Sequence, residues 1–277
     1  MDWLTWVHRY EPVGVGASSE EVSAAVSATL HQYFDESLAH RLFGHAKELD
    51  YGRAPYRLGW RDKTFGTTVW ASPTLDHFCV EVSGKGCDAL VKLGWLEPIV
   101  AATAHMLTRI DIAVDMETDV QPKEFAAARE NKRTKTSAEM HSETGETVYV
   151  GSMHSERYAR VYRYAPPHPR SHLLRVEHVY RRDYAKTVGA LVARETIRTV
   201  CASSAQLYGW CHPLADTWGK KVEDITVPRP ERNGGKTMVW LIRQCAPAFK
   251  KLVDEGAIED PVRFLEIYFL SEHAKAP

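Results

Sequence analysis

Three segments near the middle of the chain alternate polar and apolar residues, and this pattern strongly limits how the sequence can fold. The segments are residues 109–115, 158–164 and 173–179. Side chains of a β-strand point alternately to the two faces of its sheet, so each segment has one apolar face suited to a core. The opposite faces carry Arg109, Asp111, Asp115, Arg160, Tyr162, Tyr164, Arg175 and Glu177.

If these segments are neighbouring strands of one sheet, their polar groups meet on a single surface. Carboxylate oxygens favour Mg²⁺ or Mn²⁺ over zinc. A tyrosine beside such a metal is a candidate nucleophile, although a phenol with a pKa near ~10 needs a base or cation nearby to attack at neutral pH. The alternation equally fits the solvent-exposed face of a sheet with Asp–Arg and Glu–Arg pairs across strands. By itself it leaves both interpretations open.

The rest of the chain mixes strand and helix signals without a visible internal repeat or a low-complexity segment. Ser18 and Glu21 form a capping box that predicts a helix from about Ser19. Residues 84–86 (GKG) are interpreted as a turn, and Pro122 suits the first turn of a helix running to about Asn131. Further strands are expected at 56–71, 76–83, 146–152, 157–165 and 172–181, and further helices at 87–93, 97–107, 183–192, 196–208, 238–255 and 261–273.

These elements predict an α+β fold in which an antiparallel sheet carries the active site, is covered by helices and is followed by a helical C-terminal segment. We expect two parts. Residues 1–216 form the catalytic domain, and residues 217–277 form a linker, centred on 227–235, and the C-terminal helices.

Composition is typical of a soluble globular protein, with 44% hydrophobic and 26% charged residues. Five widely spaced cysteines form no C-x-x-C pair, which argues against a disulfide framework or a cysteine-rich zinc site and suits the cytoplasm. No signal peptide or membrane-spanning stretch is visible, so we expect no membrane partner.

Charge is distributed unevenly along the chain. The net charge is −1, so any nucleic-acid site must be local. Residues 151–186 hold eight basic residues against three acidic ones, and this stretch is interpreted either as a DNA-binding surface or as a solvated face. The expected DNA-binding residues are Arg157, Arg163, Tyr164, Arg170, Arg181, Arg182 and Lys186. Four histidines of the same stretch are interpreted as DNA-facing or loop residues, not as metal ligands: His154, His168, His172 and His178.

Four blocks, in order, resemble the Rep-trans family of rolling-circle replication initiators. They are 80–87 (VEVSGKGC), 108–115 (TRIDIAVD, similar to T-R-x-D-x-x-x-D), 147–162 (with Arg160 and Tyr162 as R-x-Y) and 174–177 (LRVE, similar to R-x-E). Trp240, Leu241 and Pro247 also resemble the C-terminal helix of that family. The chain departs from many relatives in having Tyr164 where they have a lysine, and it has no His-hydrophobe-His triplet of the other large class of tyrosine nickases.

The resemblance implies that Tyr162 is the nucleophile and that carboxylates hold a divalent metal, Mg²⁺ or Mn²⁺. The implied ligand is Asp111, with Asp115 and Glu177 as further candidates. Arg160 and Arg175 are expected either to clamp phosphate oxygens or to pair across strands with Asp111 or Glu177. Tyr164 is expected to stack on a base or to pack, with a role in a second strand transfer as the alternative. Gly84 and Gly86 are assigned to a turn and not to a phosphate cradle.

The implied reaction is metal-dependent transesterification by a tyrosine DNA nickase and strand transferase that makes a 5′-phosphotyrosine link at an origin of a plasmid or phage. Origin DNA, as a single strand or a hairpin, is the expected partner, with a host helicase and a second copy of the chain as candidate partners. The alternatives are a conjugative nickase of the same family and a DNA-binding regulator that has lost catalysis.

Overall fold

The computed structural model describes residues 1–128, 136–142, 145–210, 225, 227, 243 and 246–265. The chain divides into two compact units, Met1–Val227 and Pro228–Pro277. The expected boundary between residues 216 and 217 and the expected linker at 227–235, apart from Val227, lie outside the described residues.

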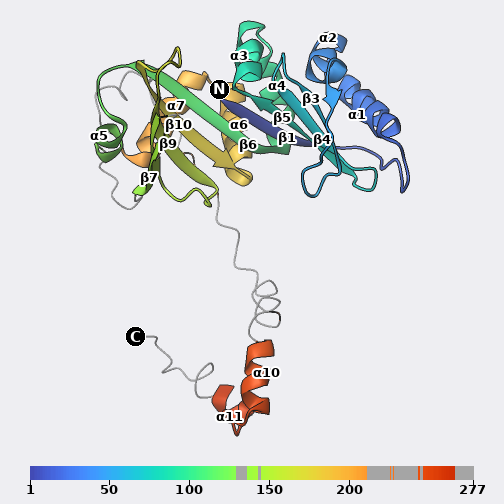
Figure 1. Ribbon diagram of the computed structural model, residues 1–277, viewed down its shortest axis with the longest axis vertical. Helices are drawn as coiled ribbons and strands as arrows, with labels where there is room; N and C mark the ends of the chain where they lie inside the picture. The colour runs from blue at the N-terminus through green and yellow to red at the C-terminus, as the bar shows by residue number, and fades with distance from the viewer. Residues whose placement is uncertain are drawn as a thin grey trace. The chain divides into compact units, whose positions relative to one another are not determined.

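An antiparallel sheet forms the framework of the first unit. Its described strands have the order β2-β3-β4-β5-β1-β6-β10-β9-β8-β7 (Figure 1). The strands are β1 (Trp3–Arg9), β2 (Lys47–Glu48), β3 (Leu58–Asp62), β4 (Thr67–Ala71), β5 (His77–Ser83), β6 (Leu107–Glu117), β7 (Thr136–Ser142), β8 (Gly145–Val150), β9 (Arg157–Tyr164) and β10 (Leu173–Arg181). The predicted α+β class and antiparallel sheet are confirmed.

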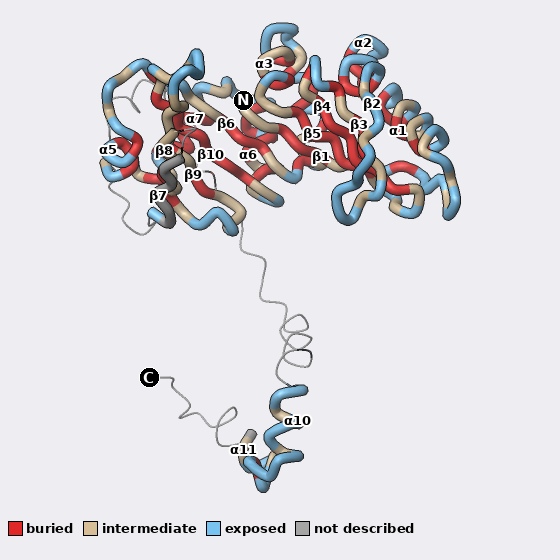
Figure 2. Tube along the Cα trace, in the orientation of Figure 1, coloured by how far each residue is buried: buried red, intermediate tan, exposed pale blue. Residues whose placement is uncertain are grey.

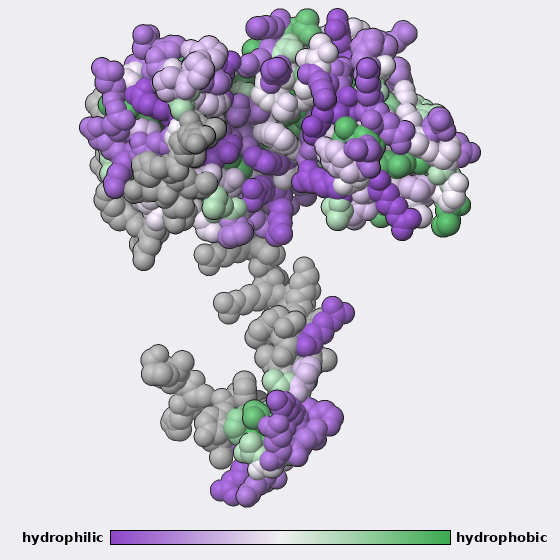
Figure 3. Space-filling view, in the orientation of Figure 1, coloured by the Kyte–Doolittle hydropathy of each residue, from purple (hydrophilic) through white to green (hydrophobic). Residues whose placement is uncertain are grey.

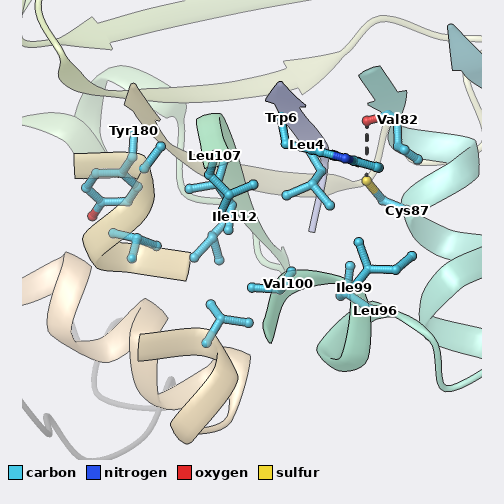
Figure 4. Packing of buried hydrophobic residues seen from close by; sticks show 14 of the residues in the cluster. Leu4, Trp6, Val82, Cys87, Leu96, Ile99, Val100, Leu107, Ile112 and Tyr180 are labelled. Carbon is cyan, nitrogen blue, oxygen red and sulfur yellow. Dashed lines mark hydrogen bonds between the residues drawn. The ribbon is translucent and has the colours of Figure 1, made fainter. Parts of the chain in front are cut away.

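Helices bury the apolar face of this sheet. In the first unit they are α1 (Ser19–Tyr33), α2 (Glu36–Ala39), η1 (His40–Gly44), α3 (Gly84–Lys92), α4 (Leu96–Thr103), η2 (Ala104–Met106), α5 (Pro122–Ala127), α6 (Asp183–Arg194) and α7 (Ile197–Tyr208). Leu4, Trp6 and Ile112 of the sheet pack with Ile99 and Val100 of α4 in one buried cluster (Figure 4). Burial runs along the central strands (Figure 2), and hydrophilic side chains dominate the visible outer surface (Figure 3). No helix among the described residues is long and apolar enough to span a bilayer.

The N-terminal end of α1 follows the predicted capping box. The Ser18 hydroxyl accepts a hydrogen bond from the backbone N–H of Glu21, whose carboxylate accepts one from the Ser18 N–H. The turn predicted at 84–86 is wrong, because α3 already begins at Gly84. A Cβ built on Gly86 would lie 2.5 Å from Val82 Cγ1 and 2.7 Å from the Phe65 carbonyl oxygen. This glycine therefore allows α3 to pack closely on the loop between β3 and β4.

Other predicted boundaries shift by a few residues. The helix from Pro122 ends at Ala127, and residues 129–131 of its predicted span lie outside the described part. Strands β1, β2 and β7 were not predicted. The omission of β1 matters most, because this strand joins the two halves of the sheet between β5 and β6.

The first unit is a structural duplication, although no repeat is visible in the sequence. The order β1, α1–α2, β2, β3, β4, β5, α3–α4 is followed by β6, α5, β7, β8, β9, β10, α6–α7. The strand order of the sheet is accordingly the same when read outward from either side of the β1–β6 pair. Strands β1 and β6 are antiparallel, as a twofold axis between two equivalent strands requires.

The second unit contains α10 (Ala246–Asp254) and α11 (Pro261–Leu265). The rings of Phe249 and Phe264 lie 5.8 Å apart between centroids and hold these helices together. The remaining residues of the helices predicted at 238–255 and 261–273 lie outside the described part, except Arg243 and Glu255.

Candidate active site

Strands β6, β10 and β9 are adjacent, so the polar faces predicted from alternation do meet on one surface. In the register, Arg175 stands between Asp115 of β6 and Tyr162 of β9. Glu177 stands beside Arg160. The apolar side chains of the same strands, such as Val176, lie on the opposite face in the core.

The centre of this surface holds two carboxylates and two arginines. Asp111 and Glu177 are both fully buried. Arg109 binds Asp111 through its Nε, 2.9 Å from Oδ1. Arg160 pairs with Glu177 Oε1 through its Nη2, which also lies 4.0 Å from Asp111 Oδ2. The four charges balance, which makes it possible to bury the two carboxylates side by side.

Tyr162 reaches this cluster through its hydroxyl. Its Oη donates a hydrogen bond to Glu177 Oε2 at 3.1 Å, and the Arg160 guanidinium carbon lies 5.8 Å from its ring centroid. Burial raises the pKa of the Tyr162 phenol above its ordinary value of 10.0, and the negative charge of Glu177 raises it further. The phenol is therefore protonated at rest, and its proton already points at an acceptor.

Glu177 is suited to receive that proton. Burial raises the pKa of its carboxyl group above 4.5, and the neighbouring Asp111 carboxylate adds to the rise, whereas Arg160 opposes it. A raised pKa makes a carboxylate a better proton acceptor near neutral pH. The arrangement thus places a candidate nucleophile in contact with a candidate base and beside a cation.

A second polar cluster lies next to the first and is organised by Arg175. Its Nε is 2.5 Å from Asp115 Oδ1 and its Nη2 is 2.7 Å from Asp115 Oδ2. Its Nη1 donates to Asp2 Oδ1 at 2.8 Å and lies 3.4 Å from the Tyr164 hydroxyl. Arg170 approaches the same Asp115, 3.5 Å away. Arg175 therefore pairs with a carboxylate across strands, but its partner is Asp115 and not the expected Asp111 or Glu177.

Tyr164 lies between the two clusters. Its hydroxyl is 3.5 Å from that of Tyr162, and its ring stacks on His168 with centroids 3.9 Å apart and planes 21° apart. In the structure Tyr164 thus stacks on a histidine, and the expected stacking on a DNA base stays a prediction. Of these two tyrosines, Tyr162 contacts Glu177 directly.

The candidate metal ligands separate into a pair and a single residue. Asp111 and Glu177 lie together, whereas Asp115 is held by Arg175. In the described part of the chain there is no group of three or more His, Cys, Asp and Glu side chains placed to hold a metal. Two carboxylates nevertheless fit Mg²⁺, which usually binds one or two carboxylates and completes its shell with water and substrate phosphate oxygens.

The expected DNA-binding residues do not all reach this face. Arg163 donates to the carbonyl oxygens of Thr118, Val120 and His172, so it fixes the loop that follows β6. The remaining contacts are as follows: Arg157 lies over the Tyr184 ring, Arg181 binds the Met153 carbonyl and Tyr158 hydroxyl, Arg182 pairs with Glu156, and Lys186 pairs with Asp183. Arg170 is the basic residue of this set that lies beside the active-site carboxylates.

One histidine was placed wrongly by the sequence. His178 is fully buried on the helix-covered face, where its ring stacks on Tyr208, 5.5 Å away. It follows Glu177 directly, so alternation turns it away from the polar surface, which could have been recognised from the sequence.

Asp2 was missed because β1 was missed. The Asp2 backbone N–H donates to the Asp111 carbonyl, and its carboxylate binds Arg175. The signal was the alternation of Leu4, Trp6 and His8, all buried, with Trp3 and Thr5 on the polar face. Arg109 was placed on the correct face by the sequence but was given no role.

Comparisons with known proteins find a similar fold in a solved structure. No family profile and no curated protein matches the chain by sequence. The fold is similar to that of a rolling circle replication initiator protein from Geobacillus stearothermophilus, with a TM-score of 0.50, 18% identity, and coverage of 75% of this chain and 83% of the other. A second structure, DynU16 from the dynemicin biosynthetic locus, matches with a TM-score of 0.20 and 13% identity over 71% of this chain and 96% of the other, which carries no argument. The first likeness establishes that the two proteins share a fold.

Proposed function

We propose that this protein nicks one strand of DNA with Tyr162 and thereby initiates rolling-circle replication. The observation that carries the proposal is the 3.1 Å hydrogen bond from the Tyr162 hydroxyl to Glu177, within a cluster that also contains Asp111 and Arg160. Three of the four sequence blocks that resemble rolling-circle initiators contribute these residues, and the shared fold of a solved initiator agrees with that resemblance.

In the proposed reaction, Glu177 accepts the phenolic proton as the Tyr162 oxygen attacks the scissile phosphorus. A Tyr162 Oη–P bond forms and the P–O3′ bond breaks. The departing O3′ takes up a proton, so the products are a 5′-phosphotyrosine and a free 3′-OH. The phosphodiester energy is retained in the tyrosyl link, so the reverse attack by a 3′-OH reseals a strand without ATP.

Arg160 is the arginine that we assign to the phosphate. It lies beside both the nucleophile and Glu177, and its guanidinium can donate to non-bridging oxygens as charge develops. Arg175 is already bound by Asp115 and Asp2, so we assign it a positioning role that sets Tyr164 beside Tyr162.

Asp111 and Glu177 are the residues that would hold Mg²⁺ or Mn²⁺, with Asp115 outside the immediate pair. When bound there, the metal would supply positive charge to the phosphate and to the ionising phenol. Arg109 and Arg160 provide the balancing charge to these carboxylates in its absence.

Covalent capture tests the proposal. The full-length protein is incubated with Mn²⁺ and overlapping single-stranded oligonucleotides that cover its own gene and the flanking DNA. We expect one oligonucleotide to give an SDS-stable adduct whose phosphate maps to Tyr162 by peptide mass spectrometry, together with a released 3′-OH fragment. An adduct on another tyrosine would overturn the site, and binding without any adduct would favour the catalytically inactive regulator.

A further inference from the structure

The two halves of the sheet place the same kind of contact at equivalent positions. In the C-terminal half, Glu177 accepts from Tyr162 and pairs with Arg160. In the N-terminal half, Glu81 of β5 accepts from the Trp70 indole N–H at 2.9 Å and pairs with Arg53. Each glutamate thus uses one oxygen for an aromatic donor and the other for an arginine.

The strand register supports this equivalence independently. Glu81 pairs with Thr68, and Trp70 lies two residues further along β4. Glu177 pairs with Arg160, and Tyr162 lies two residues further along β9. Trp70 therefore occupies the position of the nucleophile.

The same equivalence matches Trp3 with Asp111. Trp3 pairs with Ser83, two residues beyond Glu81, and Asp111 pairs with Val179, two residues beyond Glu177. Trp3 and Asp111 are also direct partners in the β1–β6 pair. A twofold axis between these strands would bring two equivalent residues together in this way.

The N-terminal copy cannot perform the reaction. An indole N–H is a hydrogen-bond donor only and has no oxygen that could attack phosphorus. The positions of Asp111 and Arg160 are taken by Trp3 and Thr68, so the carboxylate pair is lost, and the arginine on Glu81 is Arg53, which lies outside the strands of the sheet. The surface around Glu81 is a polar site without the groups for cleavage.

What this half has instead is a cavity with cationic and aromatic walls. The cavity has a volume of about 350 Å³ and is lined by Trp3, Thr68 and Glu81 together with Arg61, Lys63 and Lys85. Lys63 and Lys85 are exposed, and neither takes part in an ion pair with any other described residue. Asp62, which also lines the cavity, is occupied by the backbone N–H groups of Thr64 and Phe65.

Trp3 connects the cavity to the active site. The guanidinium carbon of Arg109 lies 4.9 Å from the Trp3 ring centroid, while Arg109 also binds Asp111. The polar surface is therefore continuous from Tyr162, across Asp111 and Arg109, to Trp3 and the cavity.

We propose that the N-terminal half of the sheet is a non-cleaving copy of the active site that holds the DNA strand on one side of the nick. The identity of the ligand, single-stranded DNA, rests on the proposed function. Trp3 offers a ring on which a base can stack, and Lys63, Lys85 and Arg61 face the backbone phosphates. Aromatic rings interleaved with cations are how proteins bind single strands with little sequence preference.

The test measures binding without cleavage. A fluorescein-labelled oligo(dT) of about 18 nucleotides, longer than one strand-binding site, is titrated with the full-length protein and followed by anisotropy. Lys63→Glu/Lys85→Glu should weaken binding by about tenfold or more and should reduce the slope of log affinity against log salt by about 1.4, the value for two lost phosphate contacts on a single strand. Because both side chains are exposed, the variant should fold normally, which circular dichroism checks.

Matched variants separate this site from a general charge effect. Lys92→Glu makes the same charge change as Lys85→Glu but at the other end of α3, and it should bind like the wild type. Trp3→Ala should weaken binding by about tenfold, whereas Trp3→Phe, which keeps a stacking ring, should lose less. Irradiation of oligo(dT) containing 5-iododeoxyuridine should cross-link the N-terminal peptide that contains Trp3.

The outcomes distinguish the two proposals. Wild-type affinity in the Lys63/Lys85 double variant, or cross-links confined to other peptides, would overturn the strand-binding site even if Tyr162 forms its adduct. Conversely, if no adduct forms with any oligonucleotide but the lysine and Trp3 effects hold, the strand-binding site stands and the nicking proposal fails.

Discussion

The two halves of the sheet share a strand arrangement but differ at the few positions on which the proposed cleavage depends. Both halves present a glutamate on the same strand of the repeat, with an arginine on one oxygen and an aromatic donor on the other. In one half the donor is the phenol of Tyr162, and in the other it is the indole of Trp70. The backbone geometry is shared, so the chemistry that each half can perform depends on side-chain identity at three equivalent positions.

The second difference is electrostatic. The C-terminal half places Asp111 against Glu177, whereas the N-terminal half places Trp3 where Asp111 would be. A buried carboxylate pair is costly unless cations balance it, and the protein supplies Arg109 and Arg160 for this purpose. That cost is characteristic of sites that carry reactive groups. In the N-terminal half, Glu81 pairs with Arg53 and has no carboxylate at the position equivalent to Asp111.

The largest expected effect comes from exchanging the two aromatic donors. Tyr162→Phe keeps the ring but removes the attacking oxygen, so adduct formation should fall by at least about three orders of magnitude while the protein still binds DNA. Trp70→Tyr, introduced into that variant, should not restore the adduct, because the N-terminal half lacks the equivalents of Asp111 and Arg160. Covalent capture on gels measures adduct formation by the single and the double variant. Rescue by Trp70→Tyr would contradict the proposal that only the C-terminal half can cleave DNA.

Removing the carboxylate that is unique to the C-terminal half should have the next largest effect. Asp111→Ala should lower the rate of adduct formation by roughly 10² to 10³, by analogy with other losses of transition-state charge stabilisation, and wild-type activity should require Mg²⁺ or Mn²⁺. Single-turnover rates with EDTA and with each metal test this expectation. Full activity of the EDTA-treated wild type would contradict it.

Changing each of the two equivalent glutamates should distinguish the one that accepts a proton from the one that has a structural role. Glu177→Gln should lower the rate of adduct formation by about 10²-fold or more, because the amide cannot accept the Tyr162 proton. Glu81→Gln should form the adduct far more readily than Glu177→Gln does. In the metal-free wild type, the raised pKa of Glu177 predicts that this carboxyl group takes up a proton on acidification at a pH above its ordinary value of 4.5. The measurement is the rate of adduct formation by both variants over a range of pH. Equal losses of rate in the two variants would show that neither glutamate is a base.

A smaller effect is expected on stability, where both halves bury a histidine on the helix-covered face. Burial lowers the pKa of His8 to about 4 and that of His178 to about 3, from 6.5. Below pH 6.5 these histidines bind protons in the unfolded chain but not in the folded chain. The free energy of unfolding should therefore be highest above about pH 6.5 and should fall as the pH drops toward 4. At about 1.4 kcal/mol per pKa unit, His8 alone accounts for a loss on the order of 3 kcal/mol.

Urea unfolding at a series of pH values measures this loss. His8→Phe should flatten the dependence, because its surroundings are the rings of Trp6, Phe34 and Phe78. An unchanged pH dependence in that variant would assign the acid sensitivity to other groups.

Local pattern was sufficient to predict much of this protein. Alternation in β6, β9 and β10 predicted the shared polar face and the residues on it, and the capping box at Ser18 predicted the start of α1, because both signals depend on residues a few positions apart. The assignment of Tyr162 as nucleophile came from the family resemblance and stays a prediction.

Tertiary structure alone decided which of these groups meet. Register between strands far apart in sequence made Arg160 the partner of Glu177 and Arg175 the partner of Asp115. It also brought Asp2 to the site from the N-terminus and aligned Trp70 with Tyr162 across a duplication that the sequence no longer displays. Pairing register is set by how whole faces pack into a common core. Residue order within one strand therefore cannot reveal the partners that the neighbouring strands supply.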